Sequence, residues 1–207
     1  GLSFPYRLRS MDIRGNIPEA VFECRPQAAG ADPESYALAG LEIEKTLTLE
    51  DDGRRLRIRF SFRNVSRPPA SIPVGFRTKN IPAFGGRGPA GAAAALNEDT
   101  QIGLSTPNGP AALRPEGHST LLLPADVPPP PFAAKVDAIP RQAWKVSPLV
   151  LTAKAGGTLT LFPDPAATAG VYLWRDSRLF TVEFLSVPRD LAAGETFAYE
   201  YTVNVKP

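Results

Sequence analysis

The amino-acid sequence predicts an all-β protein, built as a two-sheet antiparallel β-sandwich with almost no helix. Three features lead to this fold class: apolar residues alternate with polar ones in many short stretches, turn-forming residues separate these stretches, and the chain contains 23 prolines. Alternation with period two is typical of strands that bury one face. Prolines disfavour helices because each one removes a backbone donor. We therefore expect short strands joined by loops.

The clearest element is a β-hairpin over residues 41–64, with the sequence LEIEKTLTLEDDGRRLRIRFSFRN. Apolar residues alternate on both sides of Asp52-Gly53, a dipeptide that favours a tight hairpin turn. A slip of one residue would place apolar side chains opposite arginines, so the buried face fixes the register. One hairpin cannot bury its own apolar face, and a second sheet must cover it. The register predicts these opposed pairs: Leu49 with Leu56, Leu47 with Ile58, Ile43 with Phe62, Glu42 with Arg63, Glu44 with Ser61, and Thr46 with Arg59.

The remaining strands are shorter and follow the same alternation. Between them we expect a long Gly/Ala/Pro-rich loop at about 80–117, a proline-rich loop at about 124–135, a connection at 186–196 and one short helix around 138–145. No internal repeat is visible, which excludes propellers and solenoids. The prediction is therefore a single β-sandwich domain over residues 1–207. The expected strands are Tyr6–Ile13, Ala20–Cys24, Ile72–Phe76, Thr100–Ser105, His118–Leu123, Thr158–Phe162, Val171–Trp174, Leu179–Leu185 and Thr196–Val205.

Composition excludes several classes of function. The 23 basic and 21 acidic residues give a net charge of +2 and are spread along the chain, whereas a nucleic-acid-binding surface concentrates Lys and Arg on one face. No apolar run approaches the ~18 residues that a membrane span needs. Cys24 is the only cysteine, so no disulfide forms within the chain. The single histidine lies far from that cysteine, without zinc-binding spacing, and we predict neither a metal nor a cofactor.

Glu183 is the first catalytic candidate, because a carboxylate can act as acid or base on a sugar. It interrupts the apolar stretch LFTVEFL, where alternation places Thr181 and Leu185 on its own face. A glutamate beside a threonine is equally a structural feature of a half-solvated strand. His118 is the second candidate, but no strand-turn-helix elbow surrounds a serine that it would activate. The structural interpretation is the more common one for both residues.

Two polar clusters at strand ends form a candidate ligand site. Trp174 and Tyr172 share one side of a short strand that is followed by charged residues. An aromatic ring can cover the apolar face of a sugar, and planar charged groups bind its hydroxyls or carboxylates. The alternative is that Trp174 belongs to the core and that Arg175 and Asp176 form an ion pair in a turn. If the clusters meet on one sheet face, we expect an anionic glycan or another carboxylated ligand. The candidate ligand-binding residues are Trp174, Arg175, Asp176 and Arg178 in the first cluster, and Arg77, Lys79 and Asn80 in the second.

Two segments together resemble the galactose mutarotase-like β-supersandwich of sugar epimerases and of accessory domains in polysaccharide-processing proteins. The first is the hairpin at 41–64, which ends in Asn64; the second, at 179–205, runs FTVEFLSVPRDLAAGETFAYEYTV and holds the connection Leu191-x-x-Gly194-Glu195. The resemblance implies a supersandwich-like fold and places Glu183 where such an enzyme carries its catalytic base. The resembled epimerases use paired histidines, whereas His118 is the only histidine in this chain.

Three hypotheses of function follow. The first is a non-catalytic, carbohydrate-associated module of a larger exported bacterial protein, periplasmic or extracellular, which binds a glycan and contacts other domains of its parent. The second is an enzyme of the mutarotase or lyase type, with Glu183 as base and Arg77 or His118 stabilising charge. The third is an immunoglobulin-like structural or interaction module that binds a partner through an exposed sheet edge or loops.

Overall fold

The computed structural model describes residues 5–27, 38–78, 80, 102–106, 109–111, 120–129, 141–153, 157–175 and 180–206. The chain divides into two compact units. The first comprises Gly1–Phe76 and Pro188–Thr202, and the second comprises Arg77–Val187 and Val203–Pro207. The expectation of a single domain over residues 1–207 stays a prediction.

The predicted hairpin is the centre of the first unit. Strands β3 (Leu41–Glu50) and β4 (Arg55–Asn64) pair in the register expected from the sequence, and each predicted pair is present. The Arg54 backbone N–H donates to the Asp51 carbonyl at 3.0 Å, and Asp52 and Gly53 between them have positive φ angles of 50° and 84°. Positive φ at both central residues is the geometry of the two-residue turn that matches strand twist. The prediction of this hairpin is confirmed.

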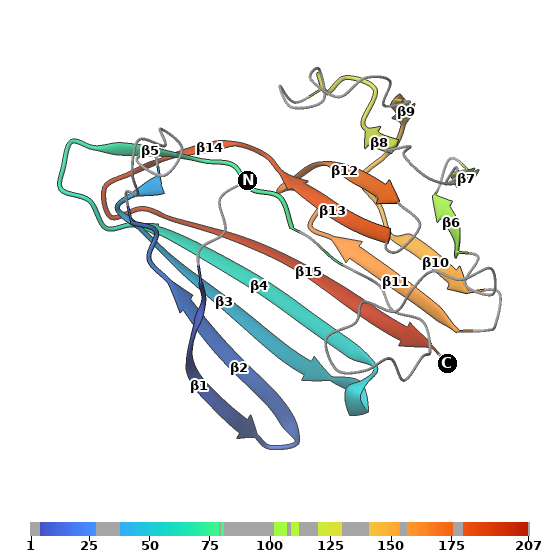
Figure 1. Ribbon diagram of the computed structural model, residues 1–207, viewed down its shortest axis with the longest axis horizontal. Helices are drawn as coiled ribbons and strands as arrows, with labels where there is room; N and C mark the ends of the chain where they lie inside the picture. The colour runs from blue at the N-terminus through green and yellow to red at the C-terminus, as the bar shows by residue number, and fades with distance from the viewer. Residues whose placement is uncertain are drawn as a thin grey trace. The chain divides into compact units, whose positions relative to one another are not determined.

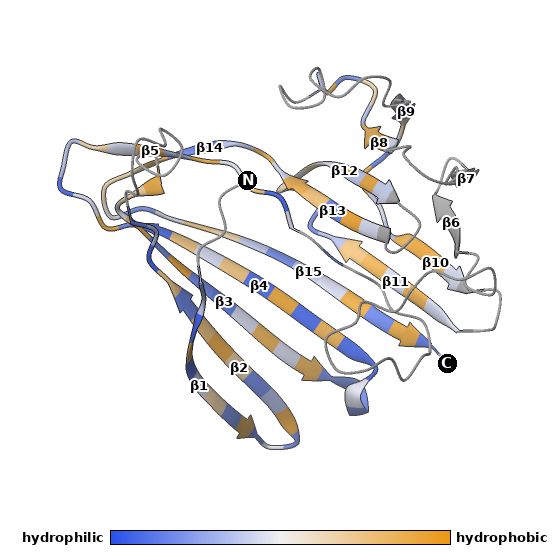
Figure 2. Cartoon of the chain, viewed as in Figure 1, coloured by the Kyte–Doolittle hydropathy of each residue, from blue (hydrophilic) through white to orange (hydrophobic). Residues whose placement is uncertain are grey.

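Three more strands extend the hairpin into a sheet within the same unit (Figure 1). The order is β1-β2-β3-β4-β15, with β1 (Arg7–Arg14), β2 (Ile17–Cys24) and β15 (Thr196–Lys206). Apolar and polar bands alternate along β3 and β4 in Figure 2, so one sheet face is apolar and the other is polar. Strand β15 continues into the second unit from Val203.

A pair of short strands covers part of the apolar face. Strands β5 (Ser71–Val74) and β14 (Arg189–Ala192) pair antiparallel and direct Ile72, Val74 and Leu191 inwards, each at most 5% exposed. Beneath them lies a row of aromatic rings, whose centroid separations run from 4.7 to 6.3 Å. Such spacing is favourable for tilted and edge contacts. The rings belong to Phe60, Phe62, Phe76, Phe197, Tyr199 and Tyr201.

Asn64 ties the end of β4 to these covering strands. Its side chain is fully buried, and Nδ2 donates to the Leu191 carbonyl at 2.8 Å and to the Ala70 carbonyl at 3.2 Å. Its Oδ1 accepts from both the backbone N–H and the hydroxyl of Ser66. A buried amide is stable only when its donors and acceptors are paired, so Asn64 has a structural role at this position.

The second unit contains two further runs of paired strands. One has the order β11-β10-β6-β7 and the other β13-β12-β8-β9, where β8 and β9 form a parallel pair. Their core is made of aliphatic and aromatic side chains that are at most 2% exposed: Leu149, Leu151 and Leu161 from the first run, and Leu122, Leu173, Val182 and Phe184 from the second. The strands are β6 (Ile102–Thr106), β7 (Gly109–Ala111), β8 (Thr120–Leu123), β9 (Arg141–Ala143), β10 (Leu149–Ala153), β11 (Thr158–Pro163), β12 (Thr168–Arg175) and β13 (Phe180–Ser186).

Two local predictions are wrong. The helix expected around 138–145 is replaced at Arg141–Ala143 by β9, which takes its backbone partners from β8 directly after Pro140. Tertiary pairing here overrides a weak helical pattern. The connection expected at 186–196 contains β14, whose backbone pairs with β5. Strands β7, β9, β10 and β14 were not expected from the sequence, because three to five residues are too few to show a period.

The fold class predicted from the sequence is confirmed. The described residues form an all-β protein of antiparallel sheets packed as a sandwich, with β8 and β9 as the parallel exception and one short 3₁₀ turn at Asp51–Gly53. The expected long loops fall mostly outside the described residues.

Candidate functional site

The structure brings Arg77, Tyr172, Trp174 and Glu183 together at the β12–β13 pair. The segment from Arg77 to Asn80 runs beside β13, with isolated bridges from Arg77 to Leu185 and from Asn80 to Val182. In the next strand, Tyr172 lies opposite Glu183 and Trp174 lies opposite Thr181. The Arg77 guanidinium is 5.6 Å from the centre of the Tyr172 ring, within cation–π range.

Glu183 is held on both sides. It is 4% exposed, its Oε1 accepts a hydrogen bond from the Thr181 hydroxyl at 2.8 Å, and its Oε2 lies 2.8 Å from Arg77 Nε. The second contact is an ion pair without the alignment of a hydrogen bond. Removing the counter-charge of a buried carboxylate is strongly destabilising, because it leaves an uncompensated charge inside the protein. This arrangement favours the structural role, and the catalytic role of Glu183 stays a prediction.

Asn80 and Trp174 are also engaged within the protein. The Asn80 amide donates to the Val182 carbonyl at 3.0 Å and to the Thr78 hydroxyl at 3.3 Å, and so fastens its segment to β13. The half-buried Trp174 packs against an apolar cluster of Leu121, Leu123, Tyr172 and Leu185. Arg175 is the last residue of β12, and its predicted role in ligand binding stays a prediction. Lys79, His118, Asp176 and Arg178 lie outside the described residues, and their predicted roles stay predictions.

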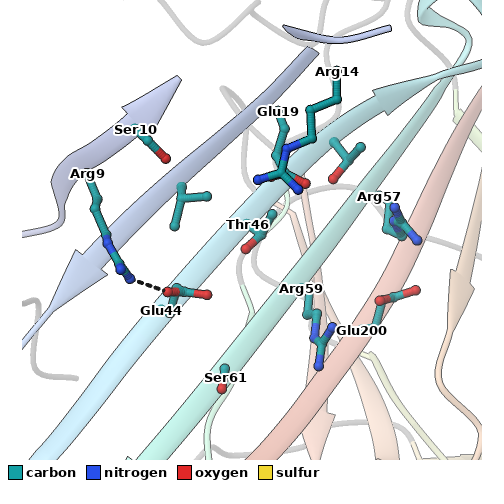
Figure 3. Close-up of a pocket in the computed structure, with 12 residues that line it drawn as sticks. Arg9, Ser10, Arg14, Glu19, Glu44, Thr46, Arg57, Arg59, Ser61 and Glu200 are labelled. Carbon is teal, nitrogen blue, oxygen red and sulfur yellow. Dashed lines mark hydrogen bonds and ion pairs between the residues drawn. The ribbon is translucent and has the colours of Figure 1, made fainter. Parts of the chain in front are cut away.

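A second candidate site lies on the polar face of the first unit. It is a hollow of about 640 Å³ lined by residues of β1, β2, β3, β4 and β15, and Figure 3 shows their side chains. Small-molecule sites typically occupy ~300–1,000 Å³, so the hollow has room for one or two sugar rings. The lining residues are Arg9, Ser10 and Arg14 from β1, Glu19 and Val21 from β2, Glu44, Thr46 and Thr48 from β3, Arg57, Arg59 and Ser61 from β4, and Glu200 from β15.

Most of the charges in this hollow are neutralised within the protein. Arg9 lies 2.8 Å from Glu44 and Arg14 lies 3.7 Å from Glu19. Arg57 pairs at 2.9 Å with Glu50, outside the hollow.

Six polar side chains in the hollow make no bond to another described residue: Ser10, Thr46, Thr48, Arg59, Ser61 and Glu200. Four of these, Thr46, Arg59, Ser61 and Glu200, are at least partly exposed and lie on the adjacent strands β3, β4 and β15. Together they offer a cation, a carboxylate and two hydroxyls to a ligand. Sugar hydroxyls both donate and accept hydrogen bonds, and charged partners strengthen such bonds.

Sequence reasoning missed this hollow. The alternation places Glu44, Thr46, Arg59 and Ser61 on the polar face of the hairpin, but a period-two pattern does not indicate that this face is hollowed. The signal that was present is the mixture of hydroxyls with arginine at opposed positions. Glu200 was not identifiable, because only the sheet order brings β15 beside β4.

Two further properties bear on function. The described residues contain no group of three or more His, Cys, Asp or Glu side chains placed to hold a metal ion. No helix in the described part of the chain has both the length and the apolar character that crossing a bilayer requires.

Sequence comparison gives no relatives: no protein-family model and no curated protein matches the chain. Comparison with solved structures does find similar folds. A galactose mutarotase-like protein from Lactobacillus casei superposes with a TM-score of 0.52 at 12% identity, over 95% of this chain and 72% of that one. A galactose mutarotase-like protein from Clostridium acetobutylicum gives 0.53 at 10% identity, over 97% and 66%. A galactose mutarotase related enzyme from Lactobacillus acidophilus gives 0.52 at 10% identity, over 98% and 71%.

These similarities extend over nearly the whole chain and over about two thirds of each solved structure. At such low identity a structural likeness establishes architecture and leaves activity open. The resemblance inferred from the hairpin at 41–64 and the segment at 179–205 is confirmed at the level of the fold. This chain has a galactose mutarotase-like fold.

Proposed function

We propose that this chain is a non-catalytic carbohydrate-binding module and that the polar hollow of the first unit receives a saccharide. The observation that carries the proposal is a group of four side chains, Thr46, Arg59, Ser61 and Glu200, which lie together in a hollow of suitable size and bond to no other described residue. A guanidinium and a carboxylate that have no partner among the described residues can each pair with a ligand. The galactose mutarotase-like fold supports a carbohydrate as that ligand.

The charges in the hollow favour binding over turnover. Hydrolysis of a glycosidic bond uses two carboxylates, one as acid and one as base or nucleophile. Of the three carboxylates here, Glu19 and Glu44 are already paired with arginines, and Glu200 alone makes no such pair with a described residue. We therefore expect saturable binding without chemical change of the sugar.

The enzymatic alternative rests on Glu183. Its test is turnover of a panel of aldoses and polyuronides by the wild-type chain and by Glu183→Gln. Turnover by the wild type that the variant loses would establish the alternative. Absence of turnover in both supports a binding module.

Membership of a larger exported bacterial protein is the remaining part of the proposal. It is supported by the resemblance to accessory domains of polysaccharide-processing proteins and by a composition rich in Ala, Arg and Pro. Fractionation of the source cells with an antibody against this chain tests it: the proposal requires a species larger than 22.2 kDa outside the cytoplasm.

The binding test is isothermal calorimetry with neutral and acidic oligosaccharides. Arg59→Ala and Glu200→Gln each remove a charged hydrogen-bond partner worth ~1.5–3 kcal/mol, so we expect affinity to fall at least ~10-fold in each. Arg63→Ala is the matched control, because Arg63 is an exposed arginine on the same strand that does not line the hollow.

Trp174→Ala separates the two candidate surfaces. Affinity lost on Arg59→Ala and Glu200→Gln, and kept on Arg63→Ala and Trp174→Ala, assigns binding to the hollow. Affinity lost only on Trp174→Ala would move the site to the face of the β12–β13 pair. Absence of heat with every sugar would refute the proposed function.

A further inference from the structure

Strand β1 forms an edge of the sheet in the first unit, and among the described strands only β2 pairs with it. Its apolar side chains are unusually open to solvent: Leu8 is 49% exposed, Met11 is 70% exposed and Ile13 is 72% exposed. An unpaired edge presents a row of backbone donors and acceptors to any strand that can dock on it. Exposed apolar side chains along such an edge add a favourable reason to dock.

Charged side chains on an edge strand usually prevent it from pairing with another chain. In β1 this protection is weak, because its positive charges are compensated. Each of its three arginines is neutralised by a glutamate: Arg7 by Glu23 and Arg14 by Glu19 of the neighbouring strand β2, and Arg9 by Glu44 of β3. Asp12, in contrast, makes no ion pair within the described residues. The edge therefore presents apolar groups, compensated cations and one uncompensated carboxylate.

We propose that two copies of this chain dimerise by antiparallel pairing of their β1 strands, with the two-fold axis at Met11. The register of β1 is irregular, because one extra residue, Arg9, is inserted between Leu8 and Ser10 relative to β2. Two residues of a bulged strand face one residue of its partner. Counted outwards from Met11, Asp12 then faces Ser10 and Arg9 of the other copy, and Ile13 faces Leu8.

This register matches both chemistry and sheet face. Apolar residues lie opposite apolar residues on one face, and Asp12 meets an arginine on the other. The terminal pair, Arg7 with Arg14, joins two arginines that already hold glutamates. A two-fold contact of this kind is self-complementary, as a closed dimer requires.

Other positions of the axis fail one of these conditions. An axis at Asp12 would oppose two carboxylates. An axis between Ser10 and Met11 would place a polar-face residue against an apolar one. An axis at Ile13 would face Asp12 with Arg14 but would leave Arg7–Ser10 without partners.

A single pair of strands buries less surface than a standard protein interface, so the dimer should be weak, with dissociation on the order of 10–1,000 μM. The first measurement is the mass of the full chain by sedimentation equilibrium, from about 1 μM to about 1 mM protein. We expect it to rise from 22.2 kDa towards twice that value. A mass that stays at the monomer value at the highest concentration would overturn the proposal.

Disulfide trapping locates the axis. Opposed residues in antiparallel strands have Cα atoms ~4.5–5.5 Å apart, within the range of a disulfide. Met11→Cys should therefore give a covalent dimer on oxidation. Ile13→Cys is the matched control, because its two copies would lie roughly four residues, or ~14 Å, apart along the strands. The native Cys24 is 4% exposed, and the oxidised wild-type chain serves as the blank. Cross-linking of Ile13→Cys, or of neither variant, would contradict the register.

A charge reversal tests the ionic part of the register. Asp12→Arg places like charges opposite each other across the axis, and we expect association to weaken at least ~10-fold. Asp126→Arg reverses an exposed aspartate in the second unit and should leave association unchanged. If the mass of the Asp12→Arg variant matches the wild type at every concentration, the two copies associate through another surface and the proposal fails.

Discussion

Replacing Asn64 by alanine should destabilise the first unit strongly. The substitution removes four hydrogen bonds at once: those from Nδ2 to the carbonyls of Leu191 and Ala70, and those from the Ser66 N–H and hydroxyl to Oδ1. It also leaves the Leu191 carbonyl without this partner in a buried place.

The magnitude follows from the burial of each bond. An unsatisfied buried group costs ~1–3 kcal/mol, and each of the three partly buried bonds contributes ~0.5–1.5 kcal/mol. The expected loss is therefore at least ~2.5 kcal/mol. With a urea m-value of ~2 kcal/mol/M, the midpoint of unfolding should fall by at least ~1.2 M.

The assay is urea unfolding of the full chain, followed by circular dichroism. Asn16→Ala, in the exposed turn between β1 and β2, is the matched control and should move the midpoint by less than ~0.3 M, as substitutions at exposed surface sites usually do. Ser66→Ala removes one of the four bonds and should give a small, measurable loss if Asn64→Ala proves too unstable to purify. A midpoint for Asn64→Ala equal to that of the control would refute the reasoning.

Three further outcomes are expected. Gly170→Ala should lower the melting temperature at a cost of ~1–3 kcal/mol, because the added methyl would lie 2.8 Å from the Leu122 carbonyl oxygen; an unchanged melting temperature would contradict the close approach of β12 to β8. The hydrogen bond from Arg7 lowers the pKa of Glu23, so its stabilisation is full above the unfolded pKa and is lost as the pH falls through the folded one. The stability difference between wild type and Glu23→Gln should therefore shrink from pH 7 to pH 3 in parallel urea titrations, and a constant difference would count against the pair. Burial raises the pKa of the Cys24 thiol, so the native chain should react with Ellman's reagent at pH 8 far more slowly than the denatured chain, and equal rates would show that the thiol is open.

The sequence was informative where local pattern and turn chemistry agree. In β3 and β4 the alternation extends over ten residues on each side of Asp52-Gly53, so a wrong register would expose the whole apolar face. Shorter elements lack this redundancy: Arg189–Ala192 offers only Leu191 as an inward residue, and its strand character comes from β5, more than a hundred residues earlier in the chain.

The residues of the polar hollow were also predictable from the sequence only where they lie within the hairpin. Alternation placed Thr46 and Arg59 opposite each other, and the structure shows this pair. That Glu200 faces the same hollow follows from the position of β15 beside β4, which no local pattern specifies. In the other cluster, the contact of Arg77 with Tyr172 depends on two segments nearly one hundred residues apart in sequence.

The positions of the two tryptophans and the single cysteine allow the unfolding of each unit to be followed separately. Both tryptophans, Trp144 and Trp174, lie in the second unit, whereas the only thiol, Cys24, lies in the first. Tryptophan emission therefore follows unfolding of one unit, and thiol labelling follows unfolding of the other, with no dye or engineered label. Coincident transitions would show that the two units unfold as one cooperative block, and separated transitions would give each unit a stability of its own.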